Sequence, residues 1–244
     1  MNWLTKHYFG EGKGIDKNAP KPTGLRLLAH VLGREWWELI KLNLLFIAFS
    51  LPVVTLPAAY GAMVRISVEM IEDRTVYLWR DFWAAFRAGF IRTSLLGAVL
   101  FGSGLLCAQA ISTYANAAKT NLAFAVPLAI GLAVAVALPL FSAHVFVALS
   151  MGRNRPLSTI LKASAIGVLT RPMPGLAALV VVALLWLAHI WFYPISVLLP
   201  VLVNFSLGAL VTSFATLKGV RLGLDFCTTD LEDGTAARSN SQLA

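Results

Sequence analysis

Two charged side chains at helical spacing are the first feature of this sequence that could take part in chemistry. Arg65 and Glu69 lie four residues apart, which on a helix brings a guanidinium and a carboxylate together on one face. They follow a long stretch without charge, so we expect the pair at or inside a membrane boundary. Charges there are costly and tend to face a protein interior or a wet cavity. The pair therefore belongs either to a solute pathway or to a structural ion pair at the interface.

The residue types that serve enzymes form no catalytic or metal-binding pattern here. Cys107 and Cys227 are far apart, and the run Gly-Glu-Gly-Lys-Gly at 10–14 lacks the GxxxxGK[ST] spacing of a phosphate loop. The histidines show neither HxxxH nor HExxH spacing, and we interpret the one at 144 as a hydrogen-bonded packing residue. We therefore expect no enzyme, no catalytic, cofactor-binding or metal-binding residues, and no cofactor. The histidines are His7, His30, His144 and His189.

The composition places the chain among integral membrane proteins. Of its 244 residues 58% are hydrophobic and 13% are charged, whereas a soluble domain has about 25% charged residues. The net charge of +8 would suggest nucleic acid for a soluble protein. Here the basic residues flank apolar runs, so the expected partner is the lipid bilayer with its anionic inner leaflet, and not nucleic acid.

The stretch Leu42–Val64 organises the rest of the chain. It contains 23 residues and no charge, but Pro52 and Pro57 interrupt it near its middle. It is either one broken span or a hairpin that enters the membrane and returns to the same side. The backbone groups freed at such a break need partners within the protein or water. The candidate hinge or pathway residues are Asn43, Pro52, Thr55, Pro57, Arg65 and Glu69.

The remaining apolar runs predict an all-α, polytopic membrane helical bundle with about six membrane helices. The first two are the short halves of the proline-broken hairpin. We expect a cytoplasmic tail at 1–22, one transmembrane domain at 23–224, and a disordered cytoplasmic tail at 225–244. The four further spans are 93–115, 122–150, 173–192 and 195–217. Ala98, Gly102, Gly104 and Ala108 give the third helix a small-residue face that lets another helix approach closely.

Two segments predict amphipathic helices at the cytoplasmic membrane surface. The first covers 23–41 and the second 77–91. In the second, aromatic residues cluster on one side and arginines on the other, which is typical of a helix lying in the interface. A helix that contacts a soluble partner has the same pattern, so both interpretations stay open. The candidate residues are Trp79, Phe82, Trp83, Phe86 and Arg87.

The distribution of Lys and Arg decides how Leu42–Val64 is threaded. If the stretch crosses once, the two sides of the membrane receive 8 and 12 of these residues. If it enters and returns, they receive 19 and 1. Cytoplasmic loops carry the positive excess, so we expect the returning hairpin and both termini in the cytoplasm. The charges leave open whether 42–64 forms two short spans or a re-entrant hairpin.

Several motifs resemble the YesL-like bacterial membrane proteins, a family of unknown function. They lie along the whole chain, at 12–21, Trp37–Leu45, Leu51–Thr55, Asp81–Arg87 and Phe205–Leu207. The resemblance implies a compact all-helical protein of the bacterial cytoplasmic (inner) membrane. Members often accompany genes for carbohydrate import of the ATP-binding-cassette (ABC) type, which implies an accessory role in oligosaccharide uptake. The family supplies no catalytic residues.

We therefore expect a non-enzymatic accessory component associated with the subunits of a carbohydrate ABC importer. The chain has no Walker motif, and 157–174 does not match the loop by which importer permeases dock their ATPase. The alternative is an independent transporter or channel for a small solute, because broken helices build substrate sites in transporters. The sequence identifies neither the substrate nor the oligomeric state.

Overall fold

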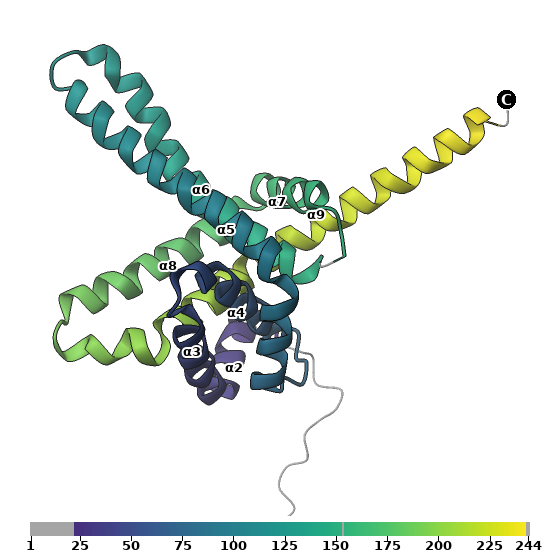
Figure 1. Ribbon diagram of the computed structural model, residues 1–244, viewed down its shortest axis with the longest axis horizontal. Coiled ribbons are helices and arrows are strands. Elements are labelled where there is room, and N and C mark those ends of the chain that lie inside the picture. Colours follow the sequence, from purple (N-terminus) through teal and green to yellow (C-terminus); the bar gives the residue numbers. More distant parts are fainter. Residues whose placement is uncertain (1–21, 153, 243–244) are drawn as a thin grey trace, which may run out of the picture.

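The computed structural model describes residues 22–152 and 154–242, with side chains through 229, and their regular structure is entirely helical (Figure 1). This confirms the all-α fold and its several membrane-length helices. The expected tail at 1–22 lies, apart from residue 22, outside the described residues. Five segments are long and apolar enough to cross a membrane: Val53–Ile71, Leu78–Ala117, Leu122–Met151, Pro172–Trp191 and Ile195–Thr229.

Helix α4 (Leu56–Ile71) forms the centre of the protein. Ten of its 16 residues are buried, and it contacts α3, α5, α6 and α9. Its small residues Ala58, Ala59 and Ala62 are all buried, which allows neighbouring helices to approach its backbone. Pro57 is its second residue, a position where a helix needs no backbone donor.

The break before α4 lies where the two prolines predict it. Helix α2 (Leu25–Arg34) is followed by α3 (Trp36–Ser50), which has 15 residues and is not among the five segments long enough to span a membrane. The chain then turns through a 3₁₀ segment, η1 (Val53–Thr55), and returns as α4. We call residues 51–55 the hinge. Its apolar residues Leu51, Val53 and Val54 are exposed on the protein surface.

Two helical arms diverge from the core (Figure 1). The first pairs the second half of α5 (Leu78–Ala117) with α6 (Ala125–Met151), joined by η2 (Leu122–Phe124). The second pairs α8 (Pro172–Trp191) with the beginning of α9 (Phe205–Gln242). The turn of this second arm contains the 3₁₀ segment η3 (Ile195–Val197) and the π-helical η4 (Pro200–Asn204).

Helix α5 unites two elements that the sequence pattern separates. It contains 40 residues, about 60 Å of helix, and includes both the expected surface helix at 77–91 and the expected span at 93–115. Its first half packs against α4 and its second half forms the arm. Helix α9 likewise continues past residue 225, the predicted start of the tail, to Gln242.

Helix α7 (Leu157–Thr170) crosses α9 at unusually short range. A Cβ added to Gly223 would lie 2.2 Å from the carbonyl oxygen of Ala163, and one added to Gly167 would lie 3.0 Å from the Gly219 backbone. The His144 ring lies against this crossing, and its Nδ1 is 2.9 Å from the Leu140 carbonyl oxygen. The hydrogen-bonded packing role expected of this histidine is therefore present at Nδ1.

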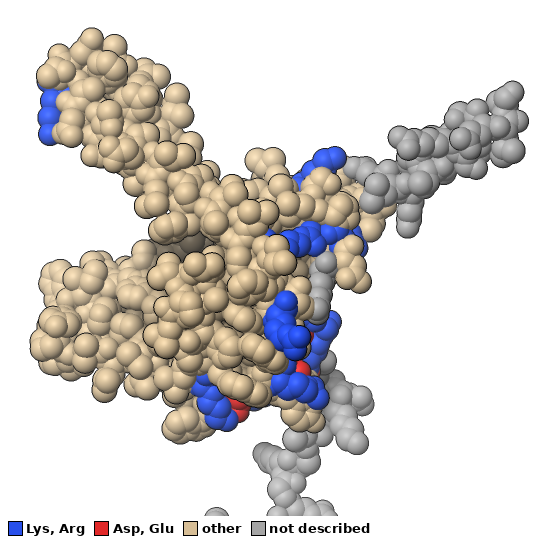
Figure 2. Space-filling view, in the orientation of Figure 1, with Lys and Arg blue, Asp and Glu red and all other residues tan. Residues whose placement is uncertain are grey.

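The charges gather at the end of the core that lies away from the arms (Figure 2). Ion pairs join Arg34 to Asp73, and Arg221 and Arg74 to Glu72, so α2 and α9 are tied to the segment after α4. We call this end the charged face. The tip of the first arm, between α5 and α6, contains a single lysine and no acid.

Candidate functional site

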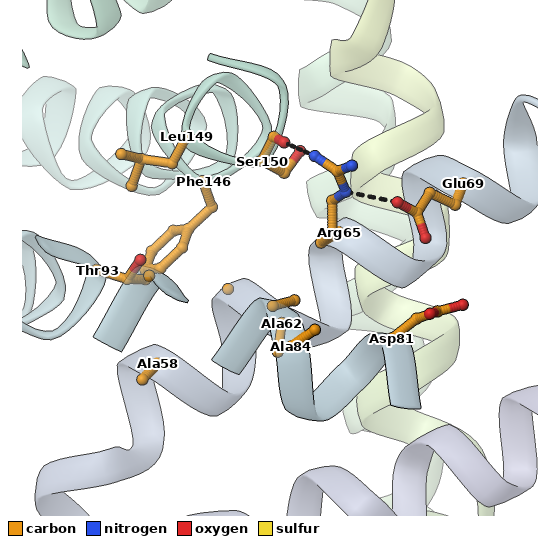
Figure 3. Close-up of a pocket in the computed structure, with 13 residues that line it drawn as sticks. Ala58, Ala62, Arg65, Glu69, Asp81, Ala84, Thr93, Phe146, Leu149 and Ser150 are labelled. Carbon is orange, nitrogen blue, oxygen red and sulfur yellow. Dashed lines mark hydrogen bonds and ion pairs between the residues drawn. The ribbon is translucent and has the colours of Figure 1, made fainter. Parts of the chain in front are cut away.

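A cleft of about 230 Å³ lies between α4 and the first half of α5, with the end of α6 as its third wall (Figure 3). Its polar residues Arg65, Glu69 and Asp81 lie at one end, and apolar residues such as Phe146 and Leu149 lie at the other. Alanines and glycines of α4 and α5 line much of the space between them. The cleft exists because these small side chains leave room between two helices that touch elsewhere.

Arg65 links the central helix to the end of α6. Its Nε donates to Glu69 Oε1 at 2.6 Å, and its Nη1 donates to the carbonyl oxygen of Ser150 (Figure 3). Ser150 is the next-to-last residue of α6, so this carbonyl has no partner within its own helix. The ion pair predicted by the spacing is therefore present, and the same guanidinium caps a second helix.

The cleft closes toward the hinge. A Cβ added to Gly61 would lie 2.6 Å from the Thr93 methyl group, and one added to Gly97 would lie 2.3 Å from the Pro57 Cβ. The two helices are thus in direct contact on the hinge side of the cleft. These contacts bound the cleft on that side.

The acids of the cleft serve different structural purposes. Glu69 neutralises Arg65, and its side chain is 16% exposed against 35% for Arg65. Asp81 accepts the backbone N–H of Tyr77 at 2.7 Å and the Arg80 Nε at 2.9 Å, so it caps the start of α5. The cleft therefore offers charge and hydrogen bonds, and its lining contains no histidine, cysteine or lysine. Within the part of the chain that the structure describes, no group of His, Cys, Asp and Glu could hold a metal ion.

Asn43 lies outside the cleft and joins α3 to the second arm. Its Nδ2 donates to the carbonyl oxygens of Pro200 at 2.9 Å and Val201 at 2.7 Å, and its Oδ1 accepts the Ser206 N–H at 2.9 Å. These partners belong to the π-helical turn and the start of α9. Asn43 is fully buried. It supplies the hydrogen bonds that an irregular turn in an apolar setting requires.

The other hinge candidates also stay out of the cleft. Thr55 Oγ1 donates to the carbonyl oxygens of Phe49 at 2.5 Å and Pro52 at 2.6 Å, which caps the end of α3. Pro52 has an extended backbone and ends the continuous helix. Pro57 lies at the closed end, against Gly97. Of the six candidate residues, the structure brings only Arg65 and Glu69 into the cleft lining.

The aromatic residues of 77–91 split into two groups. Phe82 and Phe86 are buried, and Phe49 of α3 packs on both, with ring centroids 5.4 and 5.2 Å away. Trp79 and Trp83 also contact Phe49 but remain exposed. The Arg87 guanidinium lies 5.8 Å from the Trp83 ring. The two tryptophans, together with Tyr77, thus present aromatic surface to a membrane or a partner.

Some residues that shape the cleft lie far from Arg65 along the chain, and the sequence did not predict them. The Ser150 carbonyl and the Phe146 ring come from α6, about 80 residues away from Arg65, and no local pattern announces them. One signal was present. Pro57 and Gly61 are four residues apart, as are Thr93 and Gly97, and this spacing on two neighbouring helices is typical of close packing.

Replacing Thr55 by valine removes the hydroxyl but keeps the shape of the side chain. The Phe49 carbonyl then loses its donor, whereas Pro52 O keeps the Thr55 N–H at 2.8 Å. We expect a loss of about 1–2 kcal/mol in the free energy of unfolding. Thermal unfolding of the detergent-solubilised protein measures it. Thr55→Ser retains the hydroxyl and serves as the control; equal losses in both variants would contradict the capping role.

Replacing Arg65 by methionine leaves the Glu69 carboxylate without its partner. Because Arg65 is partly exposed, we expect a moderate loss of about 1–3 kcal/mol. The double variant Arg65→Met with Glu69→Gln removes the unpaired charge as well, so its stability should exceed that of Arg65→Met. The same unfolding assay compares the two. A double variant no more stable than Arg65→Met would show that the ion pair contributes nothing.

Comparison with known proteins gives a family without an assigned function. Residues 39–109 match the model of the family described as "Protein of unknown function, DUF624". No curated protein and no solved structure matches the chain. The matched stretch contains the hinge, all of α4 and most of α5, and thus both long walls of the cleft. This part of the chain is accordingly similar to an unknown-function domain family.

Proposed function

We propose that this protein is a non-enzymatic accessory subunit that associates with the permease of a carbohydrate ABC importer in the bacterial cytoplasmic membrane. The match at 39–109 supports a family-wide core. The YesL-like motifs of the sequence, with their link to oligosaccharide uptake, support the carbohydrate context. The protein then acts by contacting another membrane protein within the plane of the membrane.

The exposure of the two arms supports this proposal most directly. In the most apolar 18 residues of each segment, 11% of the residues in α5 and 6% of those in Leu122–Met151 are buried, against 56% of those in Val53–Ile71. Large residues such as Phe101, Ile130 and Val180 are exposed on the arms. Lipid tails cover such apolar faces without preference. The two diverging helical hairpins also offer a partner membrane protein two surfaces for contact.

The charge distribution supports the orientation that we propose. The charged face contains most of the basic residues of the described chain, and the tip of the first arm contains Lys119 alone. Cytoplasmic loops carry the excess of Lys and Arg. We therefore propose six membrane helices, including the short α3, with both termini in the cytoplasm and the arm tips on the opposite side.

Crosslinking in native membranes tests the association. A photoreactive residue at Phe101 or Val180 should capture a permease subunit, whereas the same residue at Leu25 on α2 should not, because Leu25 is exposed but lies away from the arms. Mild-detergent purification should recover permease and ATPase in fixed ratio, and deletion should slow oligosaccharide uptake. A chain that purifies alone, crosslinks only to lipid and leaves uptake unchanged when deleted would overturn the proposal.

An independent transporter is the second candidate, and the cleft beside Arg65 favours it. Transporters use broken membrane helices next to a polar cleft to build their substrate sites. The contacts of Gly61 with Thr93 and of Pro57 with Gly97 close this cleft, so transport would require α4 and α5 to separate. Solute uptake into liposomes that contain the purified chain alone would establish this function. A disulfide between cysteines at 61 and 93 should then block it.

A further inference from the structure

We propose that a second groove, between α3 and the beginning of α5, binds one phospholipid with an ethanolamine headgroup from the leaflet at the charged face. We call it the α3–α5 groove. It is an open surface groove of about 660 Å³, lined by residues including Glu38, Lys41, Leu44, Ala48, Tyr77 and Trp79. It shares no lining residue with the cleft beside Arg65. The proposal requires that the chain lies in a membrane, but not that it joins an importer.

The polarity of the groove changes along α3 as it does along a lipid molecule. Glu38 and Lys41 lie toward the start of the helix, and Leu44, Leu45 and Ala48 follow toward the hinge. From residue 38 to residue 48 the helix rises about 15 Å. That is half of a hydrocarbon core of about 30 Å, or one leaflet. The groove therefore has a charged end at the depth of a headgroup and apolar walls at the depth of an acyl chain.

The charges at the polar end fit a zwitterionic headgroup. Lys41 Nζ and Glu38 Oε1 are 2.7 Å apart, and the two side chains are 59% and 35% exposed. An ethanolamine headgroup has a phosphate for the lysine and a primary ammonium that can donate hydrogen bonds to the carboxylate. A glycerol headgroup offers Glu38 no cation, and a choline headgroup offers no N–H donor. The pair thus complements ethanolamine better than either.

Aromatic side chains give the groove a fixed wall at the height of the interface. The Trp79 ring packs on Phe49 with centroids 6.0 Å apart, and the Arg80 guanidinium lies 4.4 Å from the Tyr77 ring. Tryptophan and tyrosine concentrate at the boundary between headgroups and hydrocarbon. Both aromatic side chains are exposed and make these contacts within the chain, which places aromatic surface along the edge of the groove.

Native mass spectrometry of the full-length protein tests this site. The protein is purified in mild detergent and mixed with equal amounts of phosphatidylethanolamine, phosphatidylcholine and phosphatidylglycerol that differ in acyl mass. We expect one retained phosphatidylethanolamine per chain, at several times the occupancy of either competitor. Glu38→Gln should strongly reduce this preference over phosphatidylglycerol, because the ammonium then faces a neutral amide oxygen in place of a carboxylate.

Two variants locate the bound lipid. Ala48→Trp fills the apolar end of the groove from an exposed position, and we expect at least a tenfold loss of phosphatidylethanolamine occupancy. Ala98→Trp, at an exposed position on α5 outside the groove, should leave the occupancy unchanged. Leu44→Trp provides a second blocking variant if Ala48→Trp fails to fold. Unfolding temperatures near that of the wild type confirm that the variants are intact.

Three results would overturn the proposal. One is equal lipid retention by the wild type and both blocking variants. Another is retention without preference for ethanolamine, which would indicate ordinary surface lipid. The third is a dimer or a complex with another protein that Ala48→Trp dissociates while lipid occupancy stays the same, because the groove would then accommodate a protein surface.

Discussion

Replacing Asn43 by leucine should destabilise this protein severely, by about 3 kcal/mol or more. Leucine has the same branched side-chain skeleton but bulkier end groups, so the change removes three hydrogen bonds and adds some crowding. The carbonyl oxygens of Pro200 and Val201 lose their donor, and the Ser206 N–H loses its acceptor. Each buried group left unpaired costs about 1–3 kcal/mol. Reversible unfolding from mild detergent into denaturing detergent measures the loss.

Asn204 provides the matched control for this experiment. It is also a buried asparagine, in the π-helical turn itself, but its Nδ2 makes no hydrogen bond. Asn204→Leu should therefore cost clearly less than Asn43→Leu. If both variants lose the same stability, the hydrogen bonds between α3 and the second arm are not what holds this turn, and the role assigned to Asn43 is wrong.

Adding a side chain to Gly223 should have the second large effect. A Cβ there would lie 2.2 Å from the Ala163 carbonyl oxygen and 2.9 Å from its Cα, and backbone atoms cannot rotate away. Gly223→Ala must therefore push α7 and α9 apart, at a cost of about 1–3 kcal/mol, and Gly223→Val should largely prevent accumulation of folded protein. Thermal unfolding and the yield of monodisperse protein measure these effects.

The sign of the change in stability distinguishes a steric conflict at the helix crossing from the ordinary difference in helix propensity between glycine and alanine. Alanine stabilises an exposed helix by about 0.5–1 kcal/mol relative to glycine. Gly208 on the same helix has only the Val182 side chain nearby, at 3.6 Å from an added Cβ. Gly208→Ala should thus be neutral or stabilising. A Gly223→Ala variant as stable as Gly208→Ala would contradict the close crossing of α7 and α9.

The parts of the fold that follow from local sequence were predictable. Pro52 and Pro57 interrupt a run without charge, and backbone chemistry alone requires the break that the structure contains. The pairing of Arg65 with Glu69 follows equally from helical spacing. What the sequence could not provide is the third partner of Arg65, because the carbonyl of Ser150 reaches it only through the packing of α6 on α4.

Predictions about which helix face packs were less successful. The small-residue face at Ala98, Gly102 and Gly104 pointed to close packing, yet an added Cβ at Gly102 meets nothing within 4 Å. The close contact is instead made by Gly97, the residue before Ala98, which packs against Pro57. Adjacent positions on a helix point about 100° apart, so a single sequence with several small residues does not reveal which of them faces the neighbour.

The second amphipathic segment shows a related limit. The pattern places aromatic residues and arginines on different sides of 77–91, but it does not identify what covers the aromatic face. In the structure Phe49 from α3 covers Phe82 and Phe86, so these two residues make a contact within the chain, and not with the membrane or the partner between which the sequence left the choice open. Burial by protein and burial by lipid leave the same signature in a sequence.

We propose that residues 36–71 enter the membrane and return to the same side. A reporter fused after Arg74 tests it most directly, because this position follows α4 on the charged face. We expect a green fluorescent protein fusion at this site to fluoresce and an alkaline phosphatase fusion to be inactive, with the opposite result for fusions after Lys119 at the arm tip. Active phosphatase after Arg74 would mean that Leu42–Val64 crosses the membrane once, and it would contradict this topology.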